Sequence, residues 1–139
     1  MAIGGKTINI ALSEGASDLL LDMFVSSPNP KHPEKVLIKN ALVDTGSDFT
    51  LLPEENVKKL KLVYIGTKTI TGVHNDSKDV KFYSAKINID PVIDSVFEVG
   101  VSDDFTPIIG MNLIIKWHTL INGPFKTFEI VSEENYTLK

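Results

Sequence analysis

The segment that most restricts the fold of this chain is residues 41–48. Three apolar residues lead into Asp44, and Thr45, Gly46 and Ser47 follow directly. Glycine at that position allows a tight backbone turn that a side chain would obstruct. The pattern therefore predicts a buried strand that ends in a tight turn and presents one carboxylate at its end.

Short strand patterns occupy most of the chain, and their regular spacing is typical of closed β folds. Strands are predicted over residues 7–12, 19–25, 36–43, 67–73, 80–89, 92–101, 107–110, 117–121 and 125–131. Residues 53–60 and 112–116 are expected to form short helices. We therefore expect an all-β fold, a closed barrel with one or two short helices, in one domain over residues 1–139 with a polar tail from about residue 132.

Composition narrows the class of protein. A chain of 139 residues is large enough for one domain with a sizeable core. The net charge of −4 disfavours a nucleic-acid partner, because phosphate binding needs clustered Lys and Arg. There is no cysteine for a disulfide or a thiol nucleophile, and the histidines lack the spacing of metal ligands. No apolar stretch is long enough to span a membrane. We expect a soluble, cytoplasmic protein without metal or cofactor.

A carboxylate on such a turn can activate water if a second carboxylate faces it. Two carboxylates at that distance cannot both ionise, so they share one proton, and one acts as base while the other acts as acid. The chain contains one Asp-Thr-Gly motif, at Asp44, so the second carboxylate is expected from another copy of the chain. The Thr45 hydroxyl can hydrogen-bond across such a symmetric interface, and Ser47 can orient the carboxylate.

Three segments together resemble the retropepsin group of aspartic proteases. Residues 43–48 resemble the active-site loop, and Ile108-Ile109-Gly110 resembles the apolar strand that packs beside it. Residues 69–75 resemble the flap hairpin, and the resemblance covers roughly residues 5–131. Members of this group are one-lobed homodimers with one catalytic aspartate from each subunit. The resemblance therefore implies a homodimeric aspartic endopeptidase that binds an extended peptide or protein substrate.

The resemblance also assigns roles within the loop. Asp44 matches the catalytic aspartate, Thr45 the threonine that interlocks the two loops, and Gly46 the glycine whose carbonyl faces the substrate. Ser47 and Asp48 are expected to contact substrate. In retroviral members the residue at the position of Asp48 pairs with an arginine after the second glycine. This chain departs from that pattern, because Met111 occupies the arginine position, whereas Asn112 follows at a position where the family accepts Asp or Asn.

The flap supplies the other expected substrate contacts, from Thr71, Gly72, Val73 and His74. Its tip has His74-Asn75-Asp76 in place of a glycine-rich turn, so its closing motion and specificity are expected to differ from those of the family. A solvent-exposed turn is the alternative interpretation of His74.

Two other functions remain open at this stage. A protease-like module could bind peptide without cleaving it, and Met111 and the polar flap tip agree with that hypothesis. The chain could also be a structural dimerisation domain of a larger polypeptide. Because terminal strands form much of the dimer interface in the family, Phe128 and Ile130, with Phe125 nearby, are expected to face a partner.

Overall fold

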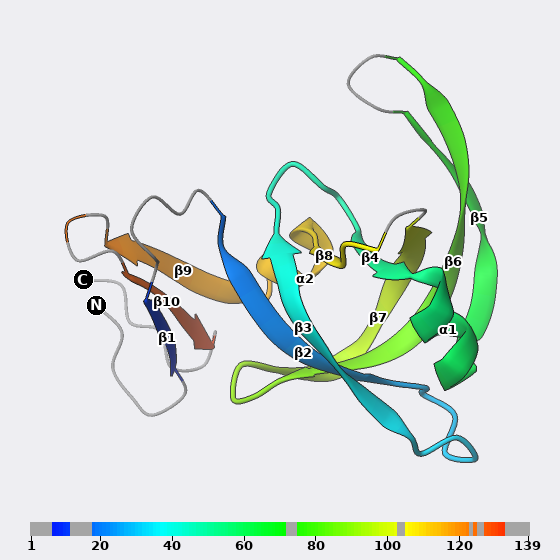
Figure 1. The fold of residues 1–139 in the computed structure, drawn as a ribbon, viewed down its shortest axis with the longest axis horizontal. Helices are drawn as coiled ribbons and strands as arrows, with labels where there is room; N and C mark the ends of the chain where they lie inside the picture. Colours follow the sequence, from blue (N-terminus) through cyan, green and yellow to red (C-terminus); the bar gives the residue numbers. More distant parts are fainter. Residues whose placement is uncertain are drawn as a thin grey trace.

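The computed structural model describes residues 7–11, 18–71, 75–102, 105–122, 124 and 127–132. These residues are mostly β, and two short helices lie among them, so the prediction of an all-β fold with one or two short helices is confirmed. The strands form a seven-stranded sheet and a separate three-stranded sheet (Figure 1).

The larger sheet has the strand order β2-β3-β8-β4-β7-β6-β5. Its strands are β2 (Leu20–Ser26), β3 (Lys35–Val43), β4 (Thr50–Pro53), β5 (Val63–Thr71), β6 (Ser77–Ile89), β7 (Ile93–Ser102) and β8 (Ile108–Ile109). An additional pairing of β2 with β6 closes six of these strands into a ring, and β5 continues outward from β6. The hairpin of β5 and β6 is here called the flap. Its β6 strand belongs to the ring where it pairs with β7, and the far end of the hairpin rises away from the ring at the upper right of Figure 1.

Alternation along β2 explains how the ring encloses a core. Leu21, Met23 and Val25 are buried, whereas the residues between them are exposed, as the two-residue repeat of a strand requires. The same inner face receives Ile87 from β6 and Val99 from β7, both fully buried. The ring therefore encloses a packed apolar core.

The smaller sheet has the order β1-β10-β9 and consists of β1 (Thr7–Ala11), β9 (Trp117–Asn122) and β10 (Thr127–Ser132). Phe128 and Ile130 are each only 1% exposed and belong to the same core cluster as Leu113 and Trp117. The expectation that they face a partner was therefore wrong, because the chain's own core already covers them. Phe125 lies outside the described residues.

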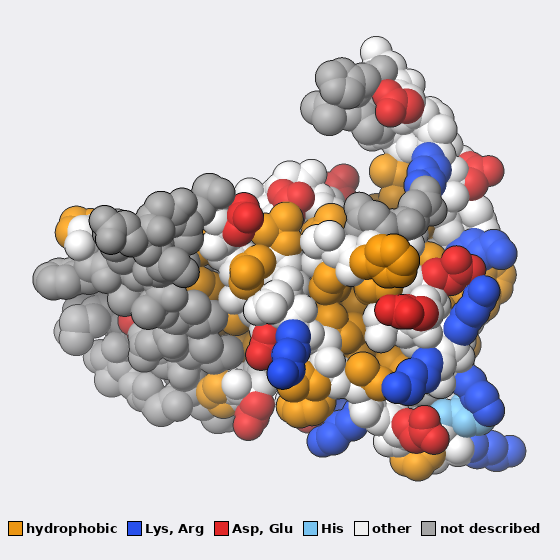
Figure 2. All heavy atoms as spheres, viewed as in Figure 1, with side chains coloured by type: hydrophobic (Ala, Val, Ile, Leu, Met, Phe, Trp, Pro, Cys, Tyr) orange, Lys and Arg blue, Asp and Glu red, His pale blue; other side chains and the backbone are white. Residues whose placement is uncertain are grey.

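Helix α1 (Glu54–Leu60) begins directly after Pro53, which is also the last residue of β4. Val57 and Leu60 are buried, and Glu54 pairs with Lys58 one turn later at 3.1 Å. Helix α2 (Met111–Ile114) follows β8. Figure 2 shows Lys side chains gathered at the end of the molecule that carries α1, while hydrophobic side chains reach the surface over its middle. Neither helix in the described residues is long and apolar enough to cross a membrane.

Candidate active site

Asp44 is the first residue after β3 and is held there by the strand on each side. Its N–H donates to the carbonyl of Ile109 at 3.0 Å, which continues the parallel pairing of β3 with β8. The N–H of Val43 donates in the opposite direction, to the carbonyl of Leu19 at 2.8 Å. The backbone that carries the carboxylate is therefore part of the sheet, and only its side chain and the following turn leave it.

The turn after Asp44 folds back on the carboxylate. The Gly46 N–H donates to Asp44 Oδ1 at 2.8 Å, and the Ser47 N–H donates to the Asp44 carbonyl at 3.2 Å. The Ser47 hydroxyl donates to the carbonyl of Phe49 at 2.7 Å, not to the Asp44 carboxylate as the sequence suggested. A backbone N–H thus orients the carboxylate, and the serine side chain shapes the loop instead.

Residues 44–49, here called the Asp44 loop, lie against the segment that follows β8. The Met111 N–H donates to the Ser47 carbonyl at 2.7 Å, and the Asn112 N–H donates to the Asp48 carbonyl at 3.2 Å. A Cβ on Gly110 would lie 2.3 Å from the carbonyl oxygen of Phe49, much closer than real Cβ atoms approach. Gly110 is therefore required for the close approach of the two backbones.

Asn112 and Thr50 fix the far end of the loop. Asn112 Oδ1 accepts from the Thr50 N–H at 2.9 Å and from the Thr50 hydroxyl at 2.8 Å. The Asn112 amide donates to the Glu98 carbonyl on β7 at 2.8 Å, and Thr50 Oγ1 accepts from the Gly110 N–H at 3.1 Å. Thr50 is fully buried. One amide side chain therefore joins β4, β7 and α2 beneath the Asp44 loop.

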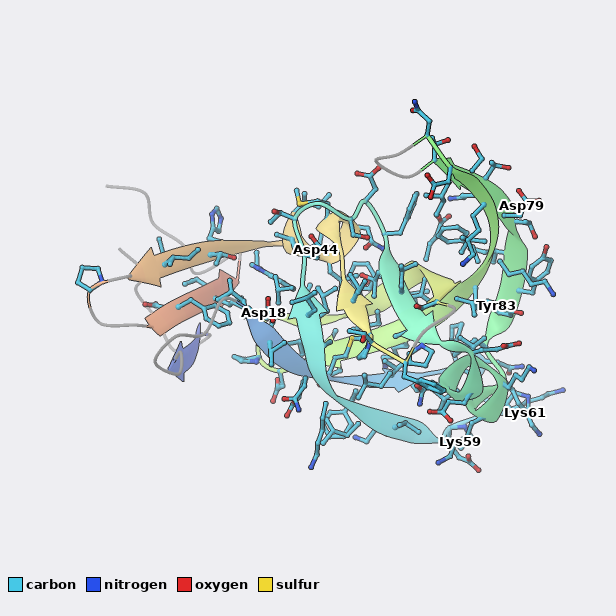
Figure 3. All side chains as sticks on the ribbon, turned by 45° about the horizontal axis from the view of Figure 1, so that its top comes forward. Asp18, Asp44, Lys59, Lys61, Asp79 and Tyr83 are labelled. Carbon is cyan, nitrogen blue, oxygen red and sulfur yellow. The ribbon has the colours of Figure 1, made fainter. Side chains whose placement is uncertain are left out.

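Asp44 is half-buried as a residue, while Thr45, Gly46 and Asp48 are exposed. Asp44 and Thr45 line the edge of a hollow of about 520 Å³. Other residues that line it are Asp18, Leu19, Leu42, Val43, Ile114, Thr119 and Ile121. Figure 3 shows Asp44 on the side of the molecule from which the flap rises, with Asp18 lower, near the start of β2. The site is thus open to solvent and bordered by apolar side chains.

After a register shift between Tyr64 and Gly66, the flap is paired in antiparallel register from Gly66 and Phe82 up to Thr71 and Ser77. The Thr69 hydroxyl donates to Asp79 Oδ1 at 2.7 Å, and the Thr71 and Ser77 hydroxyls lie 3.3 Å apart. Thr71 is exposed. The other expected flap contacts, from Gly72, Val73 and His74, lie outside the described residues.

Comparison with known proteins identifies the family to which the chain belongs. The family model described as aspartyl protease matches residues 35–113, which extend from β3 through Asp44 and the flap to α2. The chain belongs to the aspartyl protease family. No curated protein sequence matches this chain closely enough to be informative.

A solved structure agrees with the family at the level of fold. A retropepsin-like aspartic protease from Rickettsia conorii is 20% identical, with a TM-score of 0.56 and 89% of each chain covered. The retroviral protease-like domain of Ddi1 from Leishmania major is 16% identical, with a TM-score of 0.47, 86% of this chain covered and 98% of that chain. The family match and the Rickettsia conorii structure show that the chain has a retropepsin-like fold.

The structure brings together the loop residues expected from the sequence, and it adds Thr50 and Asn112, which hold the loop from below. Asp44 to Asp48 form one turn, and Met111 supports that turn through its backbone. Sequence reasoning missed the role of Thr50, and it named Asn112 only by its position in the family. A Thr-to-Asn hydrogen bond across 62 residues leaves no local pattern, although two polar residues in apolar surroundings are a weak signal.

Proposed function

We propose that this protease is a homodimeric aspartic endopeptidase whose active site contains Asp44 from each of two subunits. The observation that carries the proposal is the carboxylate of Asp44, a half-buried residue on a solvent-facing turn, which is oriented by the Gly46 N–H at 2.8 Å. Membership of the aspartyl protease family and the retropepsin-like fold support it.

The surface beside Asp44 supports a second copy as the partner. Ile121 is 65% exposed although it lines the same hollow as Asp44, and Ile114 and Val43 add further apolar surface there. Burial of such surface is the main favourable contribution to most protein associations. The exposed Thr45 hydroxyl stands next to the carboxylate, where it can bond to the partner's loop.

In the proposed dimer the two carboxylates hold one water molecule between them. One carboxylate takes a proton from the water as its oxygen attacks the scissile carbonyl carbon, and the other donates a proton to the departing nitrogen. The substrate lies extended under the flaps and pairs with backbone groups of the flaps and of the Asp44 loop. The rate is expected to be highest where the pair carries a single shared proton, at acidic to neutral pH.

The test is cleavage of a diverse pool of unstructured peptides by the wild type and by Asp44→Asn, from acidic to mildly alkaline pH. Defined cuts by the wild type that are absent with Asp44→Asn support the proposal. Cuts that persist with Asp44→Asn contradict it, and peptide binding without cleavage by the wild type favours a binding module instead. Asp18→Asn is the informative comparison, because Asp18 is the other carboxylate at the hollow. We expect Asp18→Asn to keep cleaving; equal loss in both variants would place the pair within one chain.

A further inference from the structure

Lys68, in the middle of flap strand β5, contacts two aromatic rings and one carboxylate at once. Its Nζ lies 4.9 Å from the ring centre of Phe49 and 4.7 Å from that of Phe82. The same Nζ lies 2.7 Å from Glu98 Oε2. A cation over an aromatic face is attracted by the negative charge density of the ring, so all three contacts hold the ammonium in one place.

The partners of Lys68 come from three other parts of the chain. Phe49 is the last residue of the Asp44 loop, Phe82 lies on β6, and Glu98 lies on β7. The two rings pack edge to face with centres 4.8 Å apart, and Phe82 is fully buried. The surface beneath the ammonium is therefore firmly packed, and it joins the core to the Asp44 loop.

Glu98 extends these contacts to the other side of the loop. Its side chain pairs with Lys68, while its carbonyl accepts the Asn112 amide at 2.8 Å. The Asn112 N–H in turn donates to the carbonyl of Asp48. A continuous series of contacts thus runs from the flap strand through β7 and α2 to the Asp44 loop.

The side-chain hydrogen bonds at Thr69 and Thr71, further along the flap, are of another kind. Thr69 bonds to Asp79, and Thr71 lies against Ser77, so both interactions stay within the hairpin. At Lys68, by contrast, the flap strand is tied to the loop and to β7. Lys68 pairs with Val80 in the hairpin, and β6 begins to pair with β7 two residues further on, at Phe82. Lys68 therefore stands at the boundary between the stem of the flap, which is attached to β7, and the part beyond it.

We propose that Lys68 is a positioning residue that fixes the flap stem against the Asp44 loop, so that both substrate-binding surfaces keep one relative placement. The inference rests on the proposed function, because it assigns a shared substrate to the flap and the loop. It also makes a structural claim that does not need cleavage: removing the charge of Lys68 loosens β5 and the Asp44 loop together.

The first test is backbone hydrogen exchange of the free protein. Lys68→Met keeps apolar contact with the rings and removes the charge, whereas Lys68→Arg keeps a cation that can stack and pair. The matched control is Lys86→Met, because Lys86 also forms an exposed cross-strand ion pair, with Asp94 at 3.8 Å, but away from the flap stem. Glu98→Gln is a second variant that weakens the Lys68 contact without altering Lys68.

We expect Lys68→Met to speed exchange in residues 63–71 and 45–50 by about fivefold, the factor for losing a partly exposed ion-pair or cation–π contact. Glu98→Gln should do the same to a smaller extent, Lys68→Arg should restore slow exchange, and Lys86→Met should leave both segments unchanged. Unchanged exchange in Lys68→Met, or an equal change in Lys86→Met, would overturn the proposal.

The second readout is kinetic. Because the flap and the loop bind substrate before and during reaction alike, Lys68→Met should raise KM by about fivefold and change kcat much less. A fivefold fall in kcat with unchanged KM would contradict a positioning role. If no variant cleaves peptide but exchange responds as expected, the proposed function fails while the link between stem and loop stands.

Discussion

Replacement of Asn112 by alanine tests whether one side chain holds the Asp44 loop in place. In the structure its amide makes three hydrogen bonds, to the Thr50 N–H, the Thr50 hydroxyl and the Glu98 carbonyl. Asn112→Ala removes all three and leaves the N–H of Thr50, which is fully buried, without its acceptor. Alanine is the most favourable residue for a helix backbone, so any loss of stability in Asn112→Ala measures the contribution of the Asn112 side chain.

The expected loss in the free energy of unfolding of Asn112→Ala follows from the burial of each hydrogen-bond partner. A buried donor without an acceptor costs about 1–3 kcal/mol, and each of the other two bonds contributes about 0.5–1.5 kcal/mol. We expect a loss of about 3 kcal/mol in the free energy of unfolding. For a chain of this size that corresponds to a fall of about 10 °C in Tm.

The assay is chemical denaturation, with peptide cleavage measured on the same samples. Asn112→Asp is the comparison variant, because it keeps an acceptor for Thr50 but cannot donate to the Glu98 carbonyl when ionised. It should fall between the wild type and Asn112→Ala. A loss below about 1 kcal/mol in Asn112→Ala would show that the Thr50 N–H finds another partner, and it would refute the reasoning.

Two other changes follow from close contacts and exposed surface. Gly110→Ala should lower kcat/KM by about a hundredfold, because its Cβ would lie 2.3 Å from a backbone oxygen of the Asp44 loop and a shift of about 1 Å misplaces the site. Gly100→Ala, whose Cβ would meet side-chain atoms at 2.8–3.3 Å, should keep activity within a few-fold, and equal losses would contradict the account. Ile121→Glu should convert dimer to monomer in sedimentation velocity and remove cleavage, whereas Ile115→Glu, equally exposed at 65% but outside the hollow, should not. A dimer that survives Ile121→Glu would exclude this face as the interface.

Features that depend on neighbouring residues could be predicted from the sequence. The strand before Asp44, its glycine turn and strand β2 all follow from local pattern, and the structure confirms these elements. The helix that follows Pro53 also agrees, because the proline and two acidic residues in the first turn, Glu54 and Glu55, mark its start. Beginning and end positions moved by only a few residues, as with β5, which begins at Val63 and not at residue 67.

Features that depend on partners distant in the chain could not be predicted. Strand β4 was missed because its four residues, Thr50–Pro53, pair with β7 and β8, and a short apolar run does not reveal such partners. Phe128 and Ile130 alternate as an interface strand would, but the core of the same chain covers them. The predicted contact of Ser47 with the Asp44 carboxylate was wrong for the same reason. Contacts of the loop with Met111 and Asn112 set its path, and that path brings the Phe49 carbonyl to the Ser47 hydroxyl.

The central claim is that the active site needs one Asp44 from each of two chains. The most direct measurement mixes wild-type protein with increasing amounts of Asp44→Asn at constant total concentration, allows subunits to exchange, and follows peptide cleavage. Because mixed dimers carry only one catalytic carboxylate, the account predicts that activity falls as the square of the wild-type fraction. Activity that falls only in proportion to the wild-type fraction, with subunit exchange confirmed, would contradict it.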